Sequence, residues 1–346
     1  MSSVTQTGAK TRQPGRWPGP AWTLVFLAPF IAEVLSGATR TSVIFVLVPE
    51  MMVWGCGALL IREAVRRWRG GWPSLLLLGL GLSVAEEFII QQTSLAPLPF
   101  PGALEHYGRA AGVNWIYFLF MLGFESVWVV LVPVAVTELI FAERRDRPWL
   151  KTRGMVIAGL VFLLGSRIAW YAWIKRARPM FLHVPDYHPA IMTIFAGLLA
   201  IALLGAEAYL LRGVGRTVAA RSAPPAWVVG LATLLSGFPW YVLMAFVFTP
   251  KTPQVAFGVP LAAGVVWAGI VYALFRRWTS SPQWGELHTW ASAFAATVVC
   301  MLAGFLGSSR WLRIDLIGKI VFNVIAVAGF LWLLGRIRDR SMMGEQ

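Results

Sequence analysis

Apolar residues occur in long runs that short polar connections separate along almost the whole chain. A helix needs about 20 mostly apolar residues to cross a bilayer core about 30 Å thick, and a window of that length separates ten runs. We expect helices at 21–37, 41–65, 73–93, 115–141, 154–174, 189–211, 226–248, 255–275, 288–307 and 314–334. No polar segment between the runs reaches the roughly 50 residues of a small soluble domain. The pattern predicts an all-α polytopic membrane protein, with about ten transmembrane helices in one domain over residues 21–335.

The composition agrees with this pattern. Of the 346 residues 58% are hydrophobic and 13% are charged, whereas a soluble domain carries roughly 25% charged residues. The formal charge is +14, but Lys and Arg form short blocks beside the apolar runs and no continuous basic face. The charge therefore reflects membrane topology, and we expect a lipid bilayer and no nucleic acid as partner, in a multi-pass protein of the cell membrane.

The basic blocks also predict orientation, because cytoplasmic connections are enriched in Lys and Arg. With a cytoplasmic N-terminus, twenty of the 30 Lys and Arg residues fall on the inner side. We therefore expect both termini in the cytoplasm. Residues 1–20, which are polar and rich in Gly and Pro, are predicted to be a disordered cytoplasmic tail, and residues 336–346 a second cytoplasmic tail.

Six charged residues lie deep within the predicted spans, where charges are costly and normally face a bundle interior or a wet cavity. They are Glu33, Glu50, Glu86, Glu87, Glu125 and Arg167. At about 1.5 Å per helical residue, all six fall between the bilayer midplane and the predicted outer face. We expect them to share one polar cavity, whose mouth Arg40, Gln91, His183 and His188 could line.

Glu86 and Glu87 are the most informative pair because neighbouring helical residues point about 100° apart. Ser83, Glu87 and Gln91 share one helical face, and Glu86 lies off it. Two carboxylates in different surroundings can differ in protonation, which suits acid–base chemistry or proton carriage.

A structural interpretation competes with this one. Arg167 could neutralise Glu87 or Glu125 in a buried ion pair between helices, and such pairs contribute little net stability. The five deep carboxylates, however, outnumber this single cation. Other charges near the predicted inner ends, such as Arg62, Glu63 and Glu138, are expected to be interfacial or to form local ion pairs.

Glu86-Glu87, followed by polar residues one helical turn later, resembles the first motif of the CPBP group of CAAX-processing and bacteriocin-processing intramembrane peptidases. The resemblance implies that Glu86 or Glu87 activates a water molecule for peptide hydrolysis, and that Glu125 belongs to the catalytic set. The sequence departs from that group at three points: Gln91 stands where the motif has Arg, Phe120 precedes Glu125 by five positions instead of four, and no His lies within a middle span. The resemblance to the CPBP group covers about 50 residues around the third and fourth predicted spans.

Two other functions remain open at this stage. Intramembrane carboxylates among helices interrupted by Gly and Pro suit a proton-coupled transporter of a small solute. A lipid-handling or envelope-handling protein would use the aromatic and basic residues between Trp170 and Arg176 for a headgroup. The substrate would accordingly be a membrane peptide, a small solute or a lipid. The sequence leaves the cofactor open, including a metal for a peptidase, although Cys56 and Cys300 lack the spacing of a zinc site.

Overall fold

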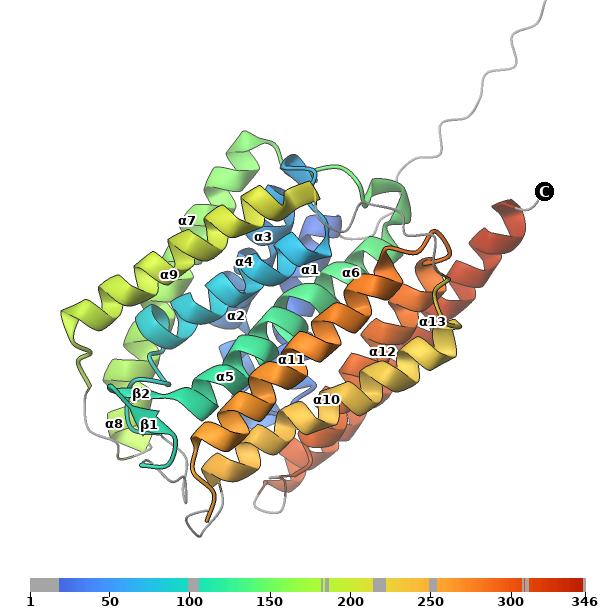
Figure 1. The fold of residues 1–346 in the computed structure, drawn as a ribbon. Helices are drawn as coiled ribbons and strands as arrows, with labels where there is room; N and C mark the ends of the chain where they lie inside the picture. Colours follow the sequence, from blue (N-terminus) through green and yellow to red (C-terminus); the bar gives the residue numbers. More distant parts are fainter. Residues whose placement is uncertain are drawn as a thin grey trace, which may run out of the picture.

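The computed structural model describes residues 19–98, 106–181, 183, 187–213, 222–248, 254–306, 308 and 311–344. Over these residues the chain is helical apart from its connections and one short hairpin (Figure 1). The helices are α1 (Pro20–Pro29), α2 (Leu47–Glu50), α3 (Cys56–Arg67), α4 (Trp72–Ala85), α5 (Trp115–Phe124), α6 (Val132–Ile140), α7 (Thr152–Trp170), α8 (Arg178–Phe181), α9 (Ile191–Leu210), α10 (Ala226–Phe248), α11 (Gly258–Thr279), α12 (Glu286–Ala303) and α13 (Arg313–Gly344).

Several of these helices join into longer rods through π turns, in which the backbone bonds i to i+5. The π turns are Phe30–Val34, Met51–Gly55, Glu86–Ile90, Glu125–Leu131 and Tyr171–Ala177. The amide of Leu35 bonds to the carbonyl of Phe30 at 2.9 Å, and that of Gln91 bonds to Glu86 at 2.9 Å, which confirms the wider spacing. α2 and α3 thereby form one rod, as do α5 and α6, and α7 and α8.

Nine helices of the described chain are long and apolar enough to cross a membrane, and the first expected span, 21–37, corresponds to a shorter apolar helix, Pro20–Val34. The first span is shorter than expected because the chain turns at Gly37, where φ is +85°. The expected helices are otherwise present. α13 continues through Gly344, so most of the predicted tail 336–346 is helical, whereas residues 1–18 of the predicted N-terminal tail lie outside the description.

The centre of the bundle is formed by α4 and by the rod of α5 and α6. Two thirds of the most apolar window in Trp72–Ile90 is buried, against 11% in Thr152–Met180 and in Ile191–Gly213. In Figure 1, α4 lies between α9 and the rod of α5 and α6. The peripheral helices expose rows of large apolar side chains, among them Leu160, Leu163 and Leu164 of α7. Such faces are stable against lipid and not against water, so the chain is an integral, multi-pass membrane protein.

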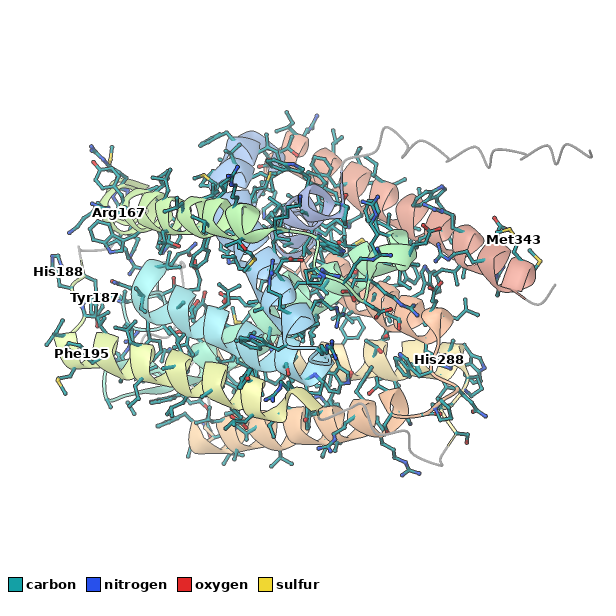
Figure 2. The ribbon with its side chains drawn as sticks, turned by 90° about the horizontal axis from the view of Figure 1, so that it is seen from above. Arg167, Tyr187, His188, Phe195, His288 and Met343 are labelled. Atoms are coloured by element: carbon teal, nitrogen blue, oxygen red, sulfur yellow. The ribbon has the colours of Figure 1, made fainter. Side chains whose placement is uncertain are left out.

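A hairpin closes one end of the bundle. Its strands, β1 (Arg109–Ala110) and β2 (Val113–Asn114), pair antiparallel. The Asn114 side chain then caps α5 by accepting a hydrogen bond from the amide of Tyr117 at 3.0 Å. Arg109 ties the hairpin to the end of the α4 segment by donating to the carbonyls of Leu95 and Ala96. We call this the hairpin end; Figure 2 shows Arg167 and His188 near it, and His288 and Met343 at the other end.

The opposite end carries a network of buried ion pairs. Arg62 is fully buried and bonds to Glu63 at 2.8 Å and to Glu138 at 3.0 Å. It also donates to the backbone carbonyls of Arg145 and Arg147, which fixes the connection after α6. The expected local ion pairs of Arg62, Glu63 and Glu138 are thus confirmed, and they gather several of the predicted inner-side basic blocks at one end.

The crossing of α1 and the Met51–Gly55 turn depends on a glycine. A Cβ added to Gly55 would overlap the backbone carbonyl of Val25. We expect Gly55→Ala to lower the free energy of unfolding in detergent by about 1–3 kcal/mol, the usual cost of overpacking. Gly159→Ala is the matched control, because no atom lies within 4 Å of its added Cβ. An equal effect of the two substitutions would contradict the close approach of the helices.

Candidate functional site

Five glutamates from four different spans are brought together inside the bundle. The carboxylate of Glu125 interacts electrostatically with those of Glu86, Glu87 and Glu33, and Glu33 also interacts with Glu50. Glu86, Glu87 and Glu125 are each only 1% exposed and Glu50 is 4% exposed, whereas Glu33 is partly exposed. We call these five residues the carboxylate cluster. Its members are packed side chains and do not line the cavity that is described below.

Each member of the cluster lies in or directly beside a π turn. Glu33 lies within Phe30–Val34, Glu86 and Glu87 open Glu86–Ile90, and Glu125 opens Glu125–Leu131. Glu50 immediately precedes Met51–Gly55. A π turn adds one residue to a helical turn, widens the backbone there and is common at functional sites. The four turns therefore mark the level at which the helices present their carboxylates to one another.

Glu86 and Glu87 have different surroundings, as the sequence predicts from their azimuths. A single carboxylate oxygen of Glu87, Oε2, accepts two hydrogen bonds: one from the Ser94 hydroxyl at 2.6 Å and one from the Ser94 amide at 2.8 Å. Neither oxygen of Glu86 has a hydrogen-bond partner among the described residues, whereas the Ser83 hydroxyl interacts with Glu125 without a well-formed hydrogen bond. Glu87 is thus held in place, whereas Glu86 and Glu125 are buried with unused acceptors.

The segment that holds Glu87 folds back into the bundle after the π turn. The amides of Gln91 and Gln92 both bond to the Glu86 carbonyl, and Gln92 adopts a left-handed φ of +58°. This reversal buries Thr93 and Ser94 and returns the Ser94 side chain to Glu87. Gln91 itself is half-buried. Its backbone amide donates to the Glu86 carbonyl, which places Gln91 beside the cluster.

Other polar groups extend the cluster. The Thr39 hydroxyl donates to Glu50. The Tyr117 side chain is buried and lies within electrostatic range of Glu33, Glu86, Glu87 and Glu125. The signal in the sequence is the spacing, because Tyr117 on α5 precedes Glu125 by eight positions, about two helical turns.

A second set of polar residues reaches the cluster through Glu33 and comes from α10, α12 and α13. Tyr241 and Cys300 both interact with Glu33, and Cys300 also interacts with Lys319. Lys319 is 3% exposed and donates to the backbone carbonyl of Leu35. The sequence interpretation missed this set because Lys319 lies near the end of its apolar run and was counted as a connection residue. The signal that could have found it is Asp315, which lies one turn before Lys319 on the same helix.

Arg167 does not join the carboxylate cluster. Its side chain is exposed on α7 and its guanidinium lies over the ring of Trp170, 4.4 Å from the centroid. Arg40 is likewise exposed and lies 5.9 Å from the Trp311 ring centroid. His183 and His188 are exposed too. Four of the residues expected at the cavity or its mouth are therefore not brought to the glutamates.

No ion pair within 4.0 Å involves any of the five glutamates, as far as the described residues go. The same residues contain no group of three or more His, Cys, Asp or Glu placed to hold a metal ion. No protein family, curated protein or solved structure matches the chain. The likeness of Glu86-Glu87 to the CPBP motif therefore stays a prediction. The arrangement itself is suited to holding protons between carboxylates.

Proposed function

We propose that this membrane protein is a proton-coupled carrier of a small solute and that the carboxylate cluster binds and releases the coupled protons. The observation that supports the proposal most strongly is the convergence of five carboxylates, from four spans, without an ion pair among the described residues. Intramembrane carboxylates that face the interior of a bundle are typical of proton relays in pumps and transporters.

Electrostatics favours protons as the occupants. Like charges in contact oppose each other's ionisation, and a buried charge without a partner is costly. Five ionised carboxylates in one cluster would need several cations, and the buried amine of Lys319 interacts with Cys300 and with the backbone carbonyl of Leu35. Shared protons remove this repulsion without any further group.

The members of the cluster are suited to different roles. Glu87 is anchored by Ser94, so it can stay in place while its neighbours change. Glu86 and Glu125 have unused acceptors and interact with each other, which suits the exchange of a proton between them. Glu33 is partly exposed and interacts with Glu50, so it could pass a proton between the Glu86–Glu125 pair and the outside of the cluster.

The π turns supply a way to move these side chains. When a π turn becomes an α turn, the residues on one side rotate by about 100°, the angle between successive helical residues. Such a change at Glu86–Ile90 would turn Glu86 relative to Glu125 without unfolding α4. A carrier needs this kind of switch, because the proton must reach the two sides of the membrane in turn.

An intramembrane peptidase is the second candidate, and one observation favours it. Glu86 lies next to the anchored Glu87 and has both oxygens free of protein hydrogen bonds, as a base that activates water requires. As far as the described residues go, the carboxylate cluster and the polar groups beside it include no histidine. Glu86→Gln should abolish cleavage of a membrane peptide on this reading.

Proton flux tests the carrier directly. Purified protein in liposomes is given a pH gradient, with valinomycin and K⁺ to prevent a membrane potential, and a pH-sensitive dye inside. Amino acids, sugars and organic acids are added one class at a time. We expect one class to accelerate dissipation of the gradient, and Glu125→Gln to reduce the rate to that of empty liposomes.

Glu207→Gln is the matched control for this experiment, because Glu207 is exposed on α9, away from the cluster. It should behave as the wild type does. Indifference of the wild-type protein to the gradient and to every solute class would contradict the carrier, and loss of flux in both variants would contradict the role of the cluster.

A further inference from the structure

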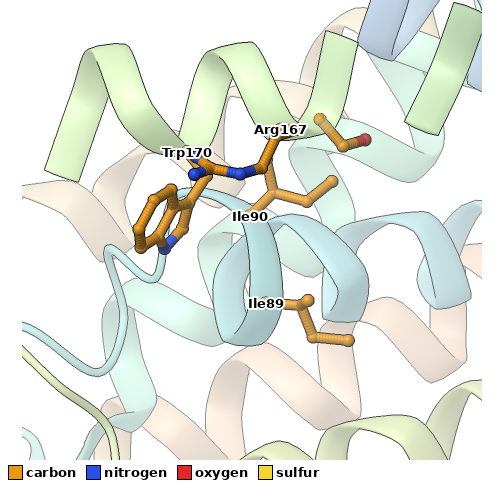
Figure 3. Close-up of a pocket in the computed structure, with 5 residues that line it drawn as sticks. Ile89, Ile90, Arg167 and Trp170 are labelled. Atoms are coloured by element: carbon orange, nitrogen blue, oxygen red, sulfur yellow. The ribbon is translucent and has the colours of Figure 1, made fainter. Parts of the chain in front are cut away.

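A cavity of about 340 Å³ lies at the hairpin end, between α7 and the π turn that follows α4. It is lined by Ile89, Ile90, Ser166, Arg167 and Trp170 (Figure 3). Ile89 and Ile90 supply an apolar wall, and α7 supplies the polar groups. α7 is among the least buried spans of the described bundle, and no member of the carboxylate cluster lines the cavity.

Arg167 brings an unneutralised cation to this cavity. It forms no ion pair or hydrogen bond with any residue that the structure describes, and its guanidinium lies over the rings of Trp170 and Tyr171. In Figure 3 the guanidinium and the indole of Trp170 lie side by side above the π turn. A guanidinium within a membrane span is costly unless it reaches an anion or water. The stacked ring orients it but does not neutralise it.

Two further features make the cavity suitable for an anion. The Ser166 hydroxyl, next to Arg167 and on the cavity wall, is buried and has no hydrogen-bond partner among the described residues. The ammonium of Lys175 lies 5.7 Å from the same Trp170 ring, so two cations flank one indole. Guanidinium and hydroxyl donors beside an aromatic ring can bind a phosphate by charge-assisted hydrogen bonds.

We infer that this cavity binds the headgroup of an anionic phospholipid. The phosphate accepts hydrogen bonds from Arg167 and Ser166, and the acyl chains lie along the exposed apolar side chains of α7, among them Leu163, Leu164 and Ile168. The volume fits a headgroup and not a whole lipid. The inference does not rest on the proposed carrier, although the lipid would contact the turn that carries Glu86 and Glu87.

Native mass spectrometry of the purified protein in detergent tests the inference, with phosphatidylglycerol as the anionic probe and phosphatidylcholine as the zwitterionic one. We expect the wild type to retain phosphatidylglycerol preferentially. Arg167→Gln should weaken that binding at least about tenfold, because it removes charge-assisted hydrogen bonds. Ser166→Ala should weaken it less, and Arg167→Lys should give an intermediate affinity.

Arg176→Gln is the matched control, since it removes the same charge from the same rod at an exposed position that bonds to Tyr171. It should leave phosphatidylglycerol binding within about threefold of the wild type, the scatter that context gives a surface charge. Equal retention of the two lipids, or an equal loss in the Arg167 and Arg176 variants, would overturn the inference. Displacement of the lipid by millimolar inorganic phosphate would overturn the assignment to a phospholipid and point to a free anion.

Discussion

Replacing Arg62 by methionine is expected to lower the free energy of unfolding by about 3–5 kcal/mol. Arg62 is fully buried, and its guanidinium is divided between two carboxylates and the backbone of the connection after α6. The ring of Trp149 lies 3.5 Å from its central carbon. Methionine fills a similar volume but donates no hydrogen bond. The carboxylates and carbonyls that Arg62 contacts would therefore lose their hydrogen-bond donor.

The cost is large because the partners stay buried. Glu63 is also fully buried and would keep the amides of Trp149 and Leu150 and a distant Arg67 at 3.6 Å. Glu138 would keep only Arg66. Removal of one member of a buried network leaves uncompensated charge, which is more damaging than replacement of the whole network.

Denaturant titration in detergent, followed by far-ultraviolet circular dichroism, measures this effect. Arg145→Met is the matched control: the Arg145 side chain is 47% exposed and pairs with Glu286 at 3.1 Å. A surface ion pair contributes about 0–1 kcal/mol, so this control should change stability little. A loss below about 1 kcal/mol for Arg62→Met would show that the network does not hold that end of the bundle.

The sequence predicted the helices well because length and hydropathy decide whether a segment spans a bilayer. Depth follows from counting residues along each span, and on that basis the sequence predicted that Arg167 and the five glutamates Glu33, Glu50, Glu86, Glu87 and Glu125 share one layer and one polar cavity. The structure brings these five together. Both successes depend on position along the helix axis, which a sequence records directly.

The azimuth of a side chain was much harder to predict. α7 is apolar on all sides, so its pattern does not indicate which face meets the bundle, and Arg167 was expected inside although it faces outward. The π turns add to this difficulty, because each inserts a residue and rotates everything after it by about 100°. No local signal marks these turns, since the packing of neighbouring helices determines them.

Long-range partners were equally hidden. Ser94 reaches Glu87 only because the chain reverses at Gln92, which takes a left-handed conformation without being glycine. Lys319 reaches the region of Glu33 from the last helix, nearly 300 positions along the chain. Such contacts follow from the arrangement of the bundle, which periodicity within one span does not encode.

Loss of a protonated carboxyl group is the second large effect that we expect. If the cluster holds protons at neutral pH, the protein contains protonated carboxyl groups at that pH. Glutamates exposed to water are ionised there and do not contribute such groups. Glu86 and Glu125 are the members with unused acceptors, and each should account for part of this signal. Gln keeps the shape of Glu but cannot carry the proton, so Glu86→Gln and Glu125→Gln remove it with little change in packing.

Infrared spectroscopy of the protein in an ester-free detergent measures this most directly, through the carbonyl stretch of protonated carboxyl groups. At neutral pH we predict a band in the wild type that weakens in Glu86→Gln and in Glu125→Gln and almost disappears in the double variant. Glu207→Gln, which changes an exposed glutamate of α9, should leave the band unchanged. Absence of the band in the wild type, or a band that the cluster variants do not alter, would contradict a proton-holding carboxylate cluster.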